Sequence, residues 1–84
     1  MKKIYVKYAT VQYDSERSIY TIQDDSGITW DSTPMVIVVN IATDKPQIVI
    51  TSTYYNNSTI FFTAIQNGEL YTQDILTYIA LIGD

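Results

Sequence analysis

The chain has 84 residues, with nine acidic against five basic side chains, and it contains neither cysteine nor histidine. This length predicts a single domain over residues 1–84 and excludes a catalytic domain joined to a separate regulatory one. The missing residue types exclude disulfides, thiolate or histidine metal sites and a histidine general base. A chain this short has a thin stability margin, so we expect that a second subunit could complete its core.

The few basic residues are concentrated near the start of the chain. Four of the five, Lys2, Lys3, Lys7 and Arg17, lie in the first part of the chain, and only Lys45 follows. Nucleic-acid binding depends on lysine and arginine side chains that displace counterions from phosphates. The sequence therefore argues against a nucleic-acid partner.

Membrane and targeting segments are not indicated either. No stretch has the ~20 consecutive apolar residues of a membrane-spanning helix. The apolar run after Met1-Lys2-Lys3 is broken by charged and polar side chains, which argues against a signal peptide. We expect no membrane partner and a cytoplasmic location, in the host cytoplasm if the protein is viral.

The first strand signal runs from Lys3 to Tyr13, a segment rich in isoleucine, valine and tyrosine. Strict alternation divides its apolar side chains between two faces. The two sets are Ile4, Val6 and Tyr8 on one face and Ala9, Val11 and Tyr13 on the other. A β-bulge near residues 8–10 would bring both sets to the core, and two shorter strands with a bend between them would do so equally well.

Polar turns separate the next segments. They lie at residues 14–16, 24–27 and 31–34, and they enclose a strand over Arg17–Gln23 and a short one over Ile28–Trp30. Aspartate, serine, glycine and proline in these turns favour tight connections, which is typical of antiparallel strands.

The segment from Met35 to Gln66 predicts a three-stranded meander, because turn residues at 44–46 and 56–57 divide it into three apolar runs. Its first run, Met35–Ala42, is apolar on both faces. A strand of this kind is usually covered on both sides, which predicts a second layer or another subunit over it.

A two-residue turn at Asn56-Asn57 would fix the register of the following hairpin. Tyr55 would then lie opposite Ser58, and one face would carry Ile48, Ile50, Phe61 and Ile65. A slip of one residue would turn these side chains outward.

The end of the chain begins with Asn67-Gly68, the strongest turn signal in the sequence. The tail over residues 73–82 has two interpretations. Tyr71, Ile75, Tyr78, Ile79 and Ile82 have helical spacing, with Gly83 as a C-terminal cap. The alternative is a last strand, with Leu76, Tyr78, Ala80 and Ile82 on one face. We favour the helix.

The predicted fold class is mainly β: a single small antiparallel meander that forms a curled sheet or small barrel of six to seven strands. One short C-terminal helix would close it, and an α+β fold is the alternative.

Catalytic chemistry finds little support in these residues. The only candidate carboxylates are Asp24, Asp25 and Asp31 around Trp30, and all three lie in turns, where aspartate accepts local backbone hydrogen bonds. The chain has three glycines and no glycine-rich phosphate loop. We therefore expect a protein that is not an enzyme and holds no cofactor or metal.

Aromatic content is the positive signal, because eight tyrosines, one tryptophan and two phenylalanines exceed what so small a core readily accommodates. Tyrosine is enriched at protein interfaces. The candidate interaction surface consists of Tyr54, Tyr55, Asn56, Trp30, Asp31 and Tyr71.

These observations predict a non-catalytic protein-binding module that binds a protein partner, itself or both as a homo-oligomer. One form would be a small virus- or phage-encoded accessory protein that inhibits a host protein. The alternative is a structural subunit of a larger viral assembly. A third hypothesis is a small-ligand or carbohydrate binder at the mouth of a barrel, near Trp30.

Overall fold

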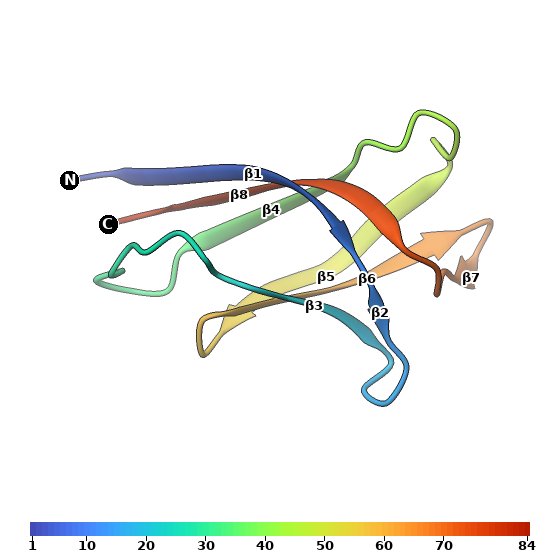
Figure 1. Cartoon of the computed structure of the whole chain (residues 1–84), viewed down its shortest axis with the longest axis horizontal. Coiled ribbons are helices and arrows are strands. Elements are labelled where there is room, and N and C mark those ends of the chain that lie inside the picture. Colours follow the sequence, from blue (N-terminus) through green and yellow to red (C-terminus); the bar gives the residue numbers. More distant parts are fainter.

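The computed structural model describes residues Met1–Asp84 and contains strands, turns and loops but no helix (Figure 1). The eight strands are β1 (Lys3–Val11), β2 (Tyr13–Asp14), β3 (Ile19–Gln23), β4 (Met35–Asn40), β5 (Ile48–Asn56), β6 (Thr59–Gln66), β7 (Glu69–Leu70) and β8 (Ile75–Gly83). All pairings are antiparallel. The mainly β fold class is confirmed, in the form of curled sheets and not of a closed barrel.

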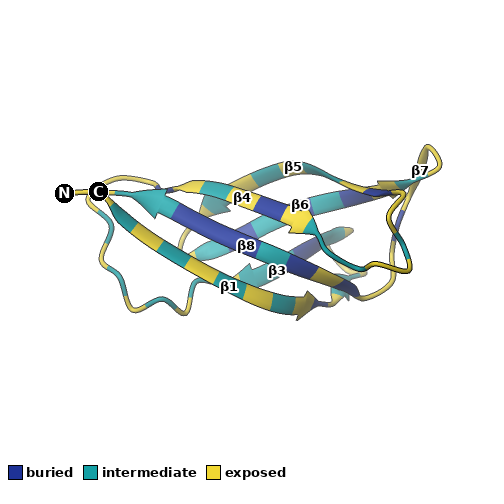
Figure 2. Cartoon of the chain, turned by 90° about the horizontal axis from the view of Figure 1, so that it is seen from above, coloured by how far each residue is buried: buried dark blue, intermediate teal, exposed yellow.

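The strands form two sheets that face each other. One has the order β1-β8-β4, and the other has the order β2-β3-β6-β5, with β7 paired to β6. The three-stranded sheet lies above the five-stranded one in Figure 1, and Figure 2 looks down on its outer side. The two chain termini lie side by side at one end of the molecule (Figure 1).

The chain passes from one sheet to the other at Gln12. β1 pairs with β8 as far as Val11, and β2 begins at Tyr13 in the other sheet, paired with β3. Of the two arrangements that the sequence leaves open here, the structure therefore has the two shorter strands with a bend between them. Val11 lies in the core at this bend and is 2% exposed.

The helix predicted over residues 73–82 is wrong, because β8 occupies Ile75–Gly83 as the central strand of its sheet. The strand pairs with β1 on one side and β4 on the other. Both faces of β8 carry apolar side chains. Ile75 and Ile79 on the inner face, together with Tyr78 and Ile82 on the outer face, therefore produce the three- and four-residue spacing that is typical of a helix. A ladder on both sides satisfies its backbone without helical hydrogen bonds.

The predicted meander over Met35–Gln66 is also wrong in its first step, because β4 pairs with β8 and not with β5. The loop between β4 and β5 turns the chain toward the other sheet. The Asn40 side-chain amide donates hydrogen bonds to the Lys45 carbonyl (2.7 Å) and the Ile48 carbonyl (3.3 Å), which hold this loop closed. A longer loop that carries side-chain hydrogen bonds takes the place of a tight hairpin turn.

β5 and β6 do form a hairpin, but its turn lies one residue later than predicted. Asn57 and Ser58 occupy the turn with φ angles of 55° and 59°, and Asn56 pairs with Thr59. A bulge at Ser52 (φ 51°) shifts the register again between Thr51 and Tyr54. The turn at Asn67-Gly68 is confirmed, with φ angles of 52° and 79°.

The shifted register inverts the face that the sequence assigns to β6. Phe62 faces inward and is fully buried, whereas Phe61 and Ile65 lie on the outside. Phe62 stacks on Tyr20, with 4.9 Å between the ring centroids. The Tyr20 hydroxyl donates to the carbonyls of Tyr71 (3.1 Å) and Gln73 (2.6 Å), so the phenol is buried with its polar atom satisfied.

The core lies between the inner faces of the two sheets. Its buried residues are Val11, Tyr20, Val38, Ile48, Ile60, Phe62, Ala64, Tyr71, Ile75, Ile79 and Leu81. Burial of these side chains is the main stabilising contribution that a chain without disulfides can draw on.

We expect Phe62→Ala to destabilise the fold by about 3–5 kcal/mol, because it removes a fully buried ring and leaves a cavity. Phe61→Ala is the matched control on the same strand, and we expect it to cost about 1 kcal/mol because its ring lies on the outer face. Urea unfolding followed by circular dichroism measures both. A larger cost for Phe61→Ala than for Phe62→Ala would contradict the register.

Candidate functional site

The outer side of the β1-β8-β4 sheet carries apolar side chains in register across all three strands. We call this surface the outer face. Its residues are Ile4, Val6, Tyr8 and Thr10 on β1, Leu76, Tyr78, Ala80 and Ile82 on β8, and Met35, Ile37 and Val39 on β4. None of them is charged, and Thr10 is the only non-aromatic polar member.

The outer face exists because three alternating segments meet in one sheet. The register aligns Ile4 with Ile82 and Met35, and it aligns Val6 with Ala80 and Ile37. Side chains two residues apart on a strand share a face, so each apolar row continues across all three strands. One sheet face is thus apolar from edge to edge.

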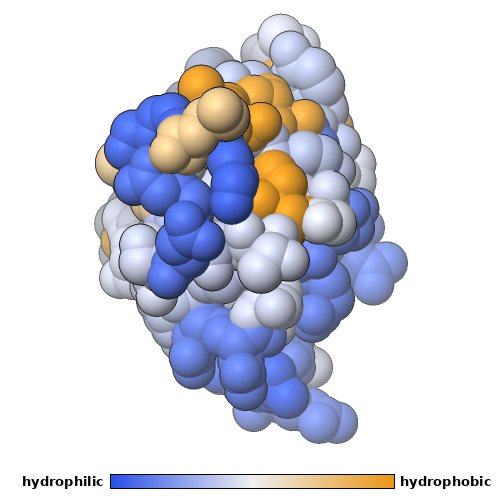
Figure 3. All heavy atoms as spheres, turned by 90° about the vertical axis from the view of Figure 1, so that its left-hand side faces the viewer, coloured by the Kyte–Doolittle hydropathy of each residue, from blue (hydrophilic) through white to orange (hydrophobic).

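Exposure is greatest on the two edge strands. Tyr8 is 71% exposed, Ile4 64% and Met35 56%, whereas Ala80 in the centre is only 4% exposed. Figure 2 shows exposed residues alternating along β1 and β4 on either side of the largely buried β8. Seen from the end that holds both termini, hydrophobic residues form a patch on the upper part of the surface, beside hydrophilic ones (Figure 3).

Leaving this face in water carries a large free-energy penalty. Seven of its large apolar side chains are on average about half exposed, and covering them would contribute roughly 5–10 kcal/mol per chain. If a large apolar residue exposes on the order of 150–200 Å² when free, these seven residues present roughly 540–720 Å². The largest apolar patch of a typical monomer is about 300–600 Å² and is often functional.

Tyr8 and Tyr78 provide the aromatic part of the outer face. Their rings form an edge-to-face pair with 5.6 Å between centroids. Aromatic side chains of this kind are the usual anchors of protein interfaces, since they offer a large area with few rotatable bonds.

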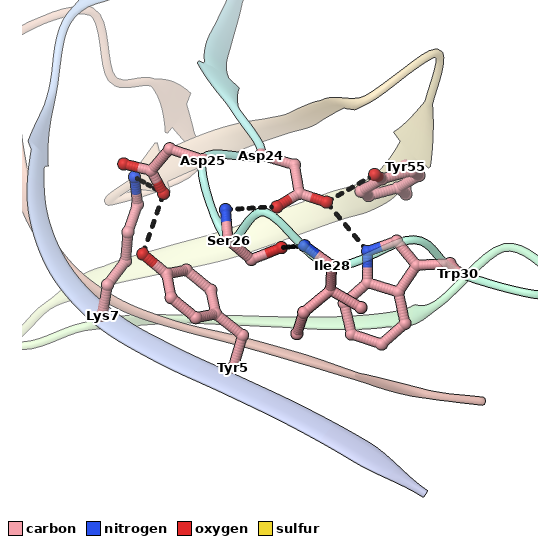
Figure 4. Close-up of polar contacts among 8 residues, drawn as sticks. All are labelled: Tyr5, Lys7, Asp24, Asp25, Ser26, Ile28, Trp30 and Tyr55. Carbon is pink, nitrogen blue, oxygen red and sulfur yellow. Dashed lines mark hydrogen bonds and ion pairs between the residues drawn. The ribbon is translucent and has the colours of Figure 1, made fainter. Parts of the chain in front are cut away.

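The inner side of β1 is different, because it carries cations. Lys3 Nζ donates to the Thr29 carbonyl (2.8 Å), and Lys7 Nζ lies 3.1 Å from Asp25 Oδ1. The Tyr5 hydroxyl also donates to Asp25 (2.9 Å), and Figure 4 shows Tyr5 and Lys7 converging on this carboxylate. Hydrogen bonds from Lys7 and Tyr5 lower the pKa of Asp25. These contacts fasten the loop after β3 along β1.

Asp24 is the centre of a second group of hydrogen bonds in the same loop. Its carboxylate accepts from Trp30 Nε1 (2.9 Å), from the Tyr55 hydroxyl (2.6 Å) and from the Ser26 backbone N–H (2.9 Å) (Figure 4). Burial raises the pKa of Asp24, but the hydrogen bonds from Ser26, Tyr55 and Trp30 outweigh it, so the pKa is lowered. We call Asp24 with these three partners the Asp24 clasp. It ties the loop to β5.

The six residues of the sequence-based interaction surface do not form one surface. Trp30 and Tyr55 meet at Asp24, where both are half-buried. Asp31 is exposed nearby, and its backbone N–H donates to the carbonyl of Asp84, the last residue (2.6 Å). These three therefore lie together at the end of the molecule that holds the termini.

The other three residues of that set point elsewhere. Tyr54 lies on the outside of the five-stranded sheet, stacked on Phe61 with 4.8 Å between ring centroids, and Asn56 is exposed at the end of β5. Tyr71 is buried at the opposite end of β6, where its hydroxyl accepts a hydrogen bond from Lys45 Nζ (3.0 Å).

Sequence reasoning missed the outer face as a site, although its alternating segments were visible. A bulge that brings Ile4, Val6 and Tyr8 to the core was one of the two arrangements left open for the first strand, and the set from Leu76 to Ile82 was an alternative to a helix. The signal that could have found the face is the placement of both segments beside Met35–Asn40 in one sheet.

The outside of the five-stranded sheet is more polar than the outer face. Exposed Val49, Tyr54 and Ile65 alternate there with threonines, of which Thr51 and Thr63 share a hydrogen bond of 2.7 Å across β5 and β6. This surface is therefore only partly apolar, and it provides a comparison within the same molecule.

One pocket of about 410 Å³ opens beside the far end of the outer face. It is lined by Thr10, Ile41, Ala42, Thr43, Asp44, Lys45, Asp74, Ile75 and Leu76. Trp30 is not part of it, so the pocket differs from the ligand site that the sequence suggested. No three Asp or Glu side chains lie close enough together to hold a metal ion.

Comparison of the chain with known protein families, curated proteins and solved structures finds no match. The structure contains no helix long and apolar enough to cross a membrane.

We expect Asp24→Ala to destabilise the protein by about 1–3 kcal/mol, because Trp30 Nε1 and the Tyr55 hydroxyl lose their acceptor. The pKa of Asp24 is lower in the folded state than in the unfolded state, where it is about 3.9. The contribution of Asp24 to stability is therefore fully present above the unfolded-state pKa, and it is lost as the pH falls through the folded-state pKa. Urea unfolding across acidic pH should thus show a shallower loss of stability for Asp24→Ala than for the wild type.

Asp31→Ala is the control, since no hydrogen bond involves the side chain of this exposed aspartate. Its stability near neutral pH should equal that of the wild type. Equal stability of Asp24→Ala and Asp31→Ala near neutral pH would show that the Asp24 clasp contributes nothing.

Proposed function

We propose that the protein is a non-catalytic protein-binding module whose outer face is covered by protein in its working state. The observation that carries the proposal is the outer face itself: a sheet surface that is apolar across three strands, uncharged and exposed. Surfaces of this size and composition are typical of protein contacts.

The state of the candidate carboxylates supports a role without catalysis. Asp24 accepts three hydrogen bonds from its own loop and from β5, and Asp25 is held by Lys7 and Tyr5. A general acid or base needs a carboxyl group that can reach a substrate and change its protonation state near the working pH. The lowered pKa values of Asp24 and Asp25 oppose that use.

The proposal extends to a cytoplasmic accessory protein, encoded by a virus or phage, that inhibits a host protein by binding it. A net charge of −4 on a small compact chain would suit a basic groove on such a target. The acidic surface outside the outer face would steer the encounter with that groove.

A structural subunit of a larger assembly is the second candidate, and one observation favours it. Val49, Tyr54 and Ile65 leave a second, partly apolar surface on the opposite side of the molecule. A subunit with apolar surfaces on two opposite sides can contact a neighbouring subunit on each side, as an assembly of many identical subunits requires.

Capture with the protein as bait tests the proposed function. We expect immobilised wild type to retain a defined protein from a lysate of the source organism or its host, and Val6→Lys to lose it because a charge stands in the middle of the outer face. Val49→Lys is the matched control, with the same substitution on the outside of the other sheet. Retention of the same protein by Val6→Lys and its loss by Val49→Lys would contradict the proposal.

A further inference from the structure

We infer that the occupant of the outer face is a second copy of this chain, packed sheet on sheet in a symmetric dimer. This inference rests on the proposed function and names the partner of the same surface. It commits to contact between two outer faces, and it excludes strand addition at the edge of a sheet.

The size of the outer face suits this occupant. The three strands lie about 4.8 Å apart, and β1 and β8 have nine residues whereas β4 has six, which gives a footprint roughly 14 Å wide and about 20–30 Å long. With roughly 540–720 Å² on each copy, the pair would bury roughly 1,100–1,400 Å², which reaches the lower end of the range of stable specific interfaces at about 1,200–2,000 Å². One copy thus offers a surface of the extent that a second copy can cover.

The composition of the outer face suits a symmetric contact. In a twofold dimer the same surface meets itself, so every charge within it would face a like charge across the interface. The outer face has no charged residue, and the net charge of −4 is carried by other surfaces. Apolar sheet faces also pack on each other in the ordinary way of β-sandwiches, with strands about 30° apart.

Contact through the edge of the sheet is disfavoured by the inner side of β1. Lys7 points inward with an 18% exposed side chain and pairs with Asp25, and Lys3 is held by the Thr29 carbonyl. Inward-pointing charges on an edge strand oppose its extension by another strand, because the added strand would bury them. The β1 edge of this sheet is therefore protected, whereas the exposed face is not.

Sedimentation velocity of the purified full chain over a concentration series tests the inference. We expect the wild type to dimerise, and Val6→Lys and Val39→Lys to weaken dimerisation about a hundredfold or more, since each buries a charge between apolar faces. Val49→Lys, which is more exposed and lies on the other sheet, should leave the dimer unchanged. Circular dichroism of each variant confirms that the fold is retained.

Salt provides an independent measurement on the same samples. An apolar contact between two acidic chains should hold or tighten as salt rises, because screening reduces their repulsion. A dimer that dissociates in high salt would depend on charge pairs that the outer face does not contain, and it would overturn the inference.

The outcomes separate this inference from the proposed function. A wild type that stays monomeric, while its capture of another protein is lost in Val6→Lys, overturns the inference and leaves the proposed function intact. If Val49→Lys dissociates the dimer and Val6→Lys leaves it intact, the contact lies on the other sheet, and the inference is overturned. If the wild type is monomeric and Val6→Lys captures the same proteins as the wild type, both the inference and the proposed function are contradicted.

Discussion

The structure depends on one strand, β8, whose two faces are both apolar. Its inner side chains Ile75, Ile79 and Leu81 are buried against the five-stranded sheet and form much of the core. Its outer side chains belong to a face with no layer of this chain above it. Hydrogen bonds to β1 and β4 hold β8 at the centre of its sheet, so the chain cannot turn the outer side inward without exposing the core.

This constraint connects stability with function. A chain of 84 residues provides only two layers, and the hydrogen bonds of Asp24, Asp25 and Asn40 serve to fasten loops that close the space between them. None of the residues 1–84 covers the outer face. The free energy that remains to be gained by covering it is of the order that drives association, which is why function is expected on this face and not at a catalytic centre.

Composition and alternation predicted much of the fold: the mainly β class and the turn at Asn67-Gly68. What failed was long-range pairing, because no local pattern states that β4 pairs with β8 across most of the chain. Period-2 apolar rows on both faces of β8 imitate helical spacing, and the one-residue bulge at Ser52 changes which side chains of β6 share a face with Ile48 and Ile50. The site depended on the fold: the sequence placed Asp24 beside Trp30 but did not bring Tyr55 to it, and the outer face required the pairing of β1, β8 and β4.

The most direct measurement of the central claim is methyl NMR with a soluble paramagnetic agent, at high and at low protein concentration. The claim predicts that the methyl groups of Val6, Ile37 and Val39 are protected from broadening at high concentration and become accessible on dilution, whereas those of Val49 are accessible throughout. Equal broadening of all four residues at every concentration would contradict it, because the outer face would then be open to solvent in a monomer that nothing covers.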